Sequence, residues 1–211
     1  FNAQPMAPIT EGQFRVFLDP LVYTKYGDAF KSEYKTSNIY PLFIDPSTLR
    51  SEDWAIALAT GGSSDALYIK RIFKILRKLP ADFSMEDIIN SIKASDLTEA
   101  QKGFARARLE ILDEYLKKDD FVNKLILGGV NIIDFRKVMY MPDDIFTIMT
   151  LIISKLQKKK EFEDEPFVFI MNEAHLYFKK GIAKEFVESI ENLIRRKRHG
   201  ANWLLLDTHL P

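Results

Sequence analysis

The stretch Phe167-Val168-Phe169-Ile170-Met171-Asn172-Glu173-Ala174-His175 decides how this chain is interpreted. Its first five residues form an uncharged apolar run, which predicts a strand buried on both faces of a parallel sheet. Open α/β sheets bind ligands just outside the carboxyl ends of such strands. Asn172 follows the run, and Glu173 is the next residue. The sequence therefore predicts a functional carboxylate at the carboxyl edge of a sheet.

Four further apolar runs bring the number of predicted strands to five. They cover residues 14–19, 39–44, 130–135 and 203–207, in addition to 167–171. Most of these runs are continuous rather than alternating, which favours a parallel sheet with helices on both faces. Helical spacing over 142–156 and 182–198 separates the last three runs. That β-α-β-α-β order predicts right-handed crossovers between neighbouring parallel strands.

Residues 51–120 show helical patterns without a convincing strand. Ser84 with Asp87, and Thr98 with Gln101, have the spacing of helix starts, and residues 67–79 and 104–116 carry helical apolar spacing. We therefore expect three parts: an amino-terminal part of the core over 1–50, an α-helical insertion over 51–120, and a carboxyl-terminal part of the core over 121–211. The segment Gly61-Gly62-Ser63-Ser64 is interpreted as a plain loop before a helix. The alternative is a phosphate cradle, because glycines before a helix can bind phosphate, and the missing P-loop lysine counts against it.

Composition excludes several classes of protein. The chain has 211 residues, 46% of them hydrophobic, and 30 basic residues balance 30 acidic ones, so any contact with nucleic acid must come from a local patch. The lack of cysteine excludes disulfides, thiolate metal sites and cysteine nucleophiles. No apolar run approaches the roughly 20 residues of a membrane span. We expect a cytoplasmic protein, and because the chain starts at Phe1 and stops at Pro211 we expect it to be part of a longer one.

Glu173 is the candidate catalytic base. In nucleotide hydrolysis, a carboxylate just past a strand orients or deprotonates the attacking water. Asn172 stands where a magnesium-coordinating aspartate is often found, and its neutral amide can hold a metal-bound water without contributing charge. The alternative is a strand end whose carboxylate is merely solvated.

Basic residues close the predicted helix 182–198. Cations are favoured at the carboxyl end of a helix, so a structural role explains most of these charges. The functional alternative concerns one of Arg195, Arg196 and Arg198, because an arginine from a neighbouring subunit of a ring ATPase neutralises charge on the transferring phosphoryl group. Thr208 and His209 follow the last predicted strand. They would emerge beside Glu173 if the two strands are neighbours, and could sense the γ-phosphate; the alternative is an ordinary solvated strand end.

In the order of these motifs, the chain resembles the HerA/FtsK-type translocase ATPases, especially the HerA branch. The resemblance covers roughly residues 14 to 211 and rests on Asp19-Pro20, a helix around Trp54, the segment 129–135, Glu173-Ala174-His175, the arginine-rich helix, and the ending Thr208-His209-Leu210-Pro211. It implies a RecA/ASCE-like P-loop NTPase core with ATP and Mg²⁺ as cofactors, Glu173 in the Walker B position, and an arginine finger from 195–198. It also implies a homo-oligomer, expected to be a hexamer, that moves DNA, with a nuclease as a further candidate partner.

Three departures from the family pattern keep alternatives open. The glycine-rich Walker A loop, which in the family precedes the strand ending in Asp19-Pro20, is absent from this chain, so the chain alone is expected to bind ATP poorly. Asn172 replaces the usual acidic residue, and His209 replaces the usual glutamine. The alternatives are a degenerate, non-hydrolysing assembly or adaptor subunit on the same fold, and an ATPase of conjugation or secretion.

Overall fold

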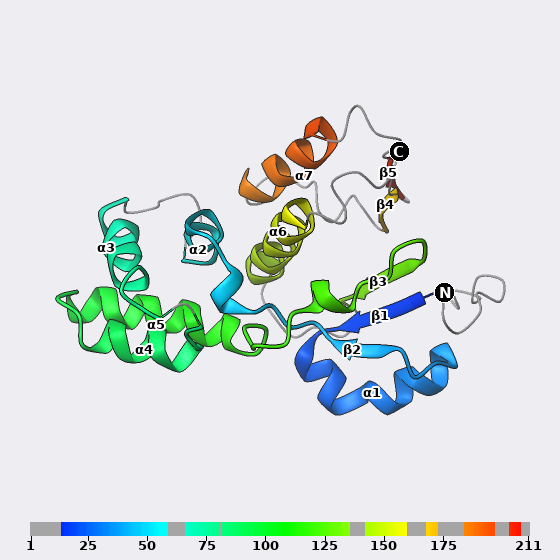
Figure 1. Cartoon of the computed structure of the whole chain (residues 1–211), viewed down its shortest axis with the longest axis horizontal. Coiled ribbons are helices and arrows are strands. Elements are labelled where there is room, and N and C mark those ends of the chain that lie inside the picture. The colour runs from blue at the N-terminus through cyan, green and yellow to red at the C-terminus, as the bar shows by residue number, and fades with distance from the viewer. Residues whose placement is uncertain are drawn as a thin grey trace.

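The computed structural model describes residues 14–58, 66–80, 82–135, 142–159, 168–172, 184–196 and 203–207. These residues form a mixed α/β structure, shown in Figure 1, with short 3₁₀ turns at Pro46–Thr48 and Phe121–Lys124. The strands are β1 Phe14–Leu18, β2 Ile39–Pro41, β3 Val130–Asp134, β4 Val168–Met171 and β5 Trp203–Leu206. The helices are α1 Pro20–Tyr34, α2 Ser51–Leu58, α3 Ala66–Leu76, α4 Met85–Lys93, α5 Glu99–Asp113, α6 Pro142–Lys158 and α7 Lys184–Arg196.

The strands form two small parallel sheets. The first has the order β2-β1-β3, with Val16 opposite Ile39 and Leu18 opposite Asp134. The second consists of β4 and β5, with Met171 opposite Leu206. Every strand pair described is parallel, which confirms the expected α/β class and the parallel pairing of the last two strands.

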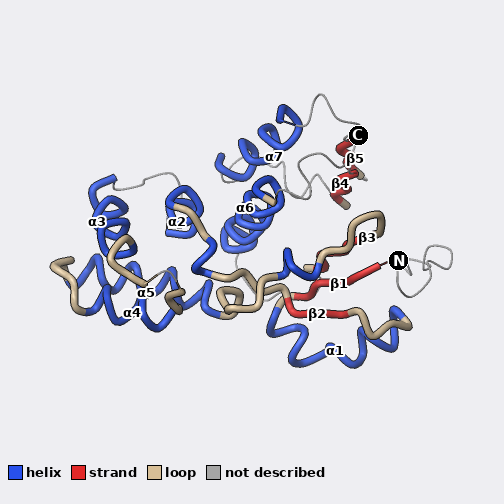
Figure 2. The backbone as a smooth tube through the Cα atoms, in the orientation of Figure 1, coloured by secondary structure: helices blue, strands red, loops and turns tan. Residues whose placement is uncertain are grey.

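The β2-β1-β3 sheet is covered on both faces, because its side chains alternate between them. Val16 and Leu18 pack with Val22 and Phe30 of α1 on one face. On the other face, Phe17 joins a larger cluster with residues of α2, α4, α5 and α6. Figure 2 shows α1 on one side of this sheet and α6 on the other. The predicted two-sided cover is therefore confirmed for this sheet.

Helix α1 begins with capping residues, a local signal that is independent of the apolar periodicity of the sequence. Asp19 is its N-cap, with a side-chain oxygen 2.9 Å from the backbone nitrogen of Val22, and Pro20 occupies the first helical position. The helix ends at Tyr34, and its C-cap Lys35 has a left-handed φ of 52°. A chain reversal at this point brings β2 back parallel to β1.

The described residues between 51 and 120 contain helices and no strand, as predicted. Capping boxes are present at both expected helix starts: Ser84 with Asp87 opens α4, and Thr98 with Gln101 opens α5. The division of the chain into three parts stays a prediction. Residues of this helical segment and Phe17 of β1 belong to one apolar cluster.

Two strand predictions need correction. The run 39–44 forms a strand only as far as Pro41, because the Ile44 amide donates to the carbonyl of Tyr115, after α5, instead of continuing a ladder. Strand β3 pairs with β1, and no described strand links it to β4, so the last three strands are not consecutive neighbours in one sheet. Sequence order predicts adjacency only where a crossover packs back on the same sheet.

The run that ends at Met171 is covered on one face only. Phe169 and Met171 face a cluster formed with Phe186 of α7 and residues of α6, whereas Val168 and Ile170 are 54% and 63% exposed. The prediction of a strand buried on both faces is therefore wrong for β4 among the described residues. An unbroken apolar run does not by itself specify which face has a covering layer.

Helix α6 lies between two apolar clusters. Ile148, Leu151 and Ile152 belong to the cluster that includes β1 and the helical segment, and Phe146 and Ile153 belong to the cluster with β4, β5 and α7. This helix therefore connects the two sheets. No helix among the described ranges is long and apolar enough to cross a membrane.

Candidate functional site

The predicted site lies at the carboxyl ends of β4 and β5, and the structure shows that these ends are adjacent. The backbone N–H of Asp207 donates a 3.0 Å hydrogen bond to the carbonyl oxygen of Met171. Asn172 and Asp207 are both exposed just beyond the last residues of their strands. The parallel register therefore places two polar positions side by side at an open sheet edge.

Several of the predicted site residues fall outside the described ranges. They are Glu173, Arg198, Thr208 and His209, together with the glycine loop over 61–64. Their positions in the chain are still informative, because Glu173 follows Asn172 and Thr208 follows Asp207. The condition under which Thr208 was expected beside Glu173, that the two strands are neighbours, is met.

Arg195 lies on the surface of α7. Its side chain is 76% exposed and pairs with Glu191, one turn earlier, at 3.3 Å. An exposed ion pair of this kind contributes little to stability. Arg195 can therefore leave Glu191 and pair with another anion at a small cost in free energy. Arg196 is the last residue of α7, and its side chain is not described. The structure therefore leaves the choice among the three arginines open.

A second carboxyl edge, at β1 and β3, holds two buried carboxylates that the sequence prediction did not include as site residues. Asp19, directly after β1, accepts a hydrogen bond from the hydroxyl of Tyr115 in addition to capping α1. Asp134, the last residue of β3, accepts one from the hydroxyl of Tyr34 at 3.1 Å. Because both carboxylates end apolar runs, the signal used for Glu173 could have found them.

These two carboxylates have a structural role in the described chain. Both Asp19 oxygens are engaged, one by the N-terminus of α1 and the other by Tyr115, and both carboxylates are buried. Hydrogen bonds of this kind are required for a carboxylate to remain in an apolar interior. The pair therefore fixes α1 and the residues after α5 to the end of the sheet, and the exposed edge at β4 and β5 remains the better candidate for binding a ligand.

The side chains at that exposed edge fit a magnesium nucleotide only in part. Asn172 offers an amide oxygen and Asp207 a carboxylate, both of the oxygen type that Mg²⁺ prefers. Among the described residues, no group of three or more histidine, aspartate or glutamate side chains is placed to hold a metal ion.

The sequence was compared with protein-family models and with curated proteins. Neither comparison finds a match.

Proposed function

We propose that this chain is part of the ATP-hydrolysing motor domain of a ring-forming DNA translocase or helicase that acts in the cytoplasm. One observation carries the proposal: β4 and β5 pair in parallel with Met171 opposite Leu206. The residues that follow them, Asn172-Glu173 and Asp207-Thr208, therefore leave from neighbouring strand ends. A catalytic carboxylate and a polar sensor of the γ-phosphate need that juxtaposition.

Each residue has a stated role in this proposal. Glu173 orients and deprotonates the attacking water, and the Asn172 amide would hold Mg²⁺ through a bound water. One of Arg195, Arg196 and Arg198 reaches across a subunit interface toward the transferring phosphoryl group. ATP supplies that group, and Mg²⁺, when bound, would stabilise its negative charge. Thr208 and His209 contact the γ-phosphate.

Magnesium-dependent ATP hydrolysis tests the proposal directly. The assay uses the chain completed with whatever coding sequence lies upstream of Phe1, with and without duplex DNA. We expect turnover that DNA stimulates and that Glu173→Gln lowers by about 100-fold or more. Glu110→Gln, an exposed glutamate of α5, is the matched control and should leave turnover unchanged. Equal turnover in Glu173→Gln and Glu110→Gln would remove Glu173 from the proposal.

A second candidate is a non-hydrolysing assembly or adaptor subunit. Asn172 favours it, because an exposed neutral amide at the strand end contributes no charge to a metal site. A completed chain that forms rings but shows no turnover would support this alternative. Turnover without DNA stimulation would instead favour a motor for conjugation or secretion.

A further inference from the structure

The first turn of helix α6 is paired with α5. Asp144 lies 3.0 Å from the guanidinium of Arg108, and the same guanidinium donates to the hydroxyl of Thr147 at 3.3 Å. The side chains of Arg108 and Asp144 are only 14% and 10% exposed. Separating such a pair leaves two poorly solvated charges without partners, which is strongly destabilising. The start of α6 therefore separates from α5 only at a high cost.

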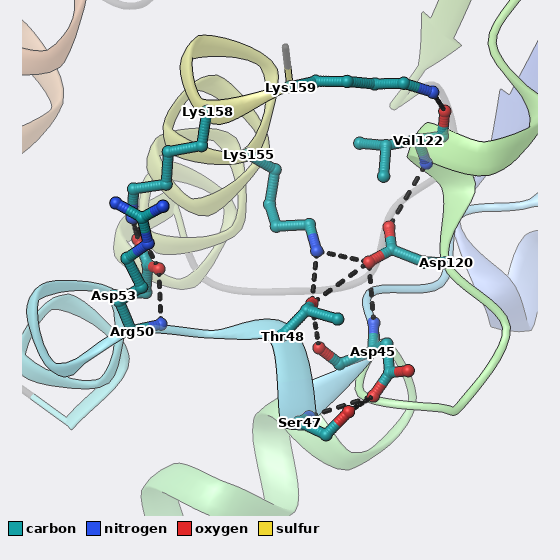
Figure 3. A network of polar contacts seen from close by, with 10 residues as sticks. All are labelled: Asp45, Ser47, Thr48, Arg50, Asp53, Asp120, Val122, Lys155, Lys158 and Lys159. Atoms are coloured by element: carbon teal, nitrogen blue, oxygen red, sulfur yellow. Dashed lines mark hydrogen bonds and ion pairs between the residues drawn. The ribbon is translucent and has the colours of Figure 1, made fainter. Parts of the chain in front are cut away.

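Two further ion pairs lie near the other end of α6. Lys155 pairs with Asp120, whose side chain is 3% exposed, and Lys158 pairs with Asp53, whose side chain is 1% exposed. Figure 3 shows both lysines directed from α6 toward these aspartates of the helical segment. Ion pairs at both ends therefore attach α6 to the helical segment.

The apolar side chains between these ion pairs strengthen the same attachment. Ile148, Leu151 and Ile152 of α6 belong to the large apolar cluster. That cluster also contains buried residues of α2, α4 and α5, together with Phe17 of β1. Apolar burial stabilises roughly in proportion to the area removed from water. Helix α6, the helical segment and the first sheet therefore share one extensive core.

On its other side, α6 contacts α7 through a much smaller apolar cluster. A ring contact between Phe146 and Phe186, 5.4 Å from centre to centre, belongs to this contact, as does a 3.1 Å hydrogen bond from the Gln157 amide to the carbonyl of Ser189. The buried members of the cluster are Phe146 and Ile153 of α6, Met171 of β4, and Phe186, Ile190 and Leu193 of α7. Among the residues that the structure describes, far fewer side chains are therefore buried on this side of α6.

The sheet of β4 and β5 adds little burial of its own. Ile170 lies opposite Leu205 in the register, and these side chains are 63% and 49% exposed. Parallel sheets normally have cover on both faces, and two strands alone are marginally stable at best. Within the described part of the chain, this sheet therefore relies on its contacts with α6 and α7.

We propose that β4, α7 and β5 open as one cooperative unit, whereas α6 stays attached to the helical segment and the first sheet. Proteins open locally in cooperative units, and the units with few buried apolar contacts open most readily. The carboxyl edge with Asn172 and Asp207 belongs to the unit that opens. Opening therefore moves this edge relative to the edge that holds Asp19 and Asp134. The inference does not depend on which reaction the chain performs.

Native-state hydrogen exchange of the full chain, followed by NMR, tests the proposal. The amide of Ile190 reports on α7, and that of Asp207, which donates to a carbonyl of β4, reports on the pairing of the two strands. The amides of Leu109 in α5 and Ile152 in α6 report on the large core. Under conditions in which exchange reports the opening equilibrium, protection of Ile190 and Asp207 should be lower by roughly 100-fold or more.

The amide of Ile152 is decisive, because α6 contacts both clusters. If Ile152 exchanges as fast as Ile190, α6 opens together with α7 and the proposal is wrong. Equal protection of all four amides would mean that the chain opens only by global unfolding. Protection of Asp207 as high as that of Leu109 would mean that β5 does not open with α7. Each of these three results overturns the proposal.

A matched pair of variants separates opening of this unit from global unfolding. Ile88 of α4 is buried in the large cluster, and Ile190 of α7 is buried in the small one. Ile88→Val weakens the closed and the open form alike, so exchange of Leu109 should accelerate by about 2- to 10-fold while that of Asp207 stays unchanged. Ile190→Val removes contacts that opening breaks, so both amides should exchange faster. If Ile88→Val accelerates Asp207 as much as Leu109, the inference fails.

Discussion

The amide of Asp207 donates a 3.0 Å hydrogen bond to the carbonyl of Met171, directly after the paired residues Met171 and Leu206 of β4 and β5. The adjacency of Asn172 and Asp207 follows from this bond and from the parallel register. The proposed function depends on this relationship, so the first prediction concerns the strand that maintains it.

Truncating Met171 should destabilise the chain, whereas truncating its neighbour should not. Met171 is buried against α6 and α7, so Met171→Ala should cost about 2–5 kcal/mol of unfolding free energy. Ile170 points to the exposed face, and Ile170→Ala should change stability by about 0.5 kcal/mol. Urea denaturation of both variants measures the difference. Equal costs would mean that β4 has cover on both faces in solution.

The hydroxyl of Tyr115 should contribute more to the free energy of unfolding than an ordinary tyrosine hydroxyl does. Tyr115→Phe leaves one oxygen of the buried Asp19 without its donor, which should cost about 1–3 kcal/mol. The control is Tyr23, a half-buried residue of α1. Tyr23→Phe should lower the free energy of unfolding by about 0.5 kcal/mol or less. Thermal or chemical denaturation compares the two. A cost for Tyr115→Phe no larger than the control would show that Asp19 does not rely on this bond.

Arg195→Ala should leave the fold intact. Its ion pair with Glu191 is exposed, so the loss should be below about 0.5 kcal/mol, measurable by denaturation. Any effect on ATP turnover would then report directly on function. If an arginine acts between subunits, mixing its alanine variant with Glu173→Gln chains should restore turnover, because an intact carboxylate then meets an intact arginine. Testing Arg195, Arg196 and Arg198 in turn would identify which one acts, and failure of all three to complement would exclude action between subunits.

Acid should weaken the capping box at the start of α4. The pKa of Asp87 lies below its usual value of 3.8. The larger cause is the hydrogen bond from the backbone N–H of Ser84, and the second is the bond from the Ser84 hydroxyl. Both donors lie 2.7 Å from the same Asp87 oxygen. A carboxyl group with a lowered pKa contributes stability above its unfolded pKa, and that contribution is lost as pH falls through the folded value. The capping box should therefore weaken only below about pH 4.

Carbon NMR titration of the Asp87 carboxyl group measures this shift. Ser84→Ala should raise the pKa of Asp87 part of the way toward 3.8, because the larger contribution, from the backbone N–H, remains. Ser95→Ala, whose hydroxyl donates to the carbonyl of Ile92 at the other end of α4, should leave the Asp87 titration unchanged. A full return to 3.8 in Ser84→Ala would mean that the hydroxyl, not the backbone, causes the shift.

The structure confirms those sequence predictions that rest on local patterns. Each of the five predicted runs contains a strand, and the capping boxes at Ser84 and Thr98 begin α4 and α5 as expected. Helix α1 was missed although Asp19-Pro20 is a helix start by capping alone, because its apolar residues are too sparse to show a clear period. Capping residues therefore predict the start of this helix better than apolar periodicity does.

The candidate site could be predicted only in part. The position of Asn172 at the end of β4 follows from the apolar run, and the structure agrees. The buried carboxylates Asp19 and Asp134 were overlooked as a pair, because their proximity depends on β1 and β3 pairing across more than a hundred residues of chain. The roles of Glu173 and of the arginines stay predictions.

The sequence by itself determined where strands and helices form, because apolar periodicity and capping residues act over a few neighbouring positions. Only the tertiary structure decided which strands pair, which face of β4 has cover, and where α6 lies. Those choices depend on contacts between distant residues, such as Lys155 with Asp120 and Lys158 with Asp53.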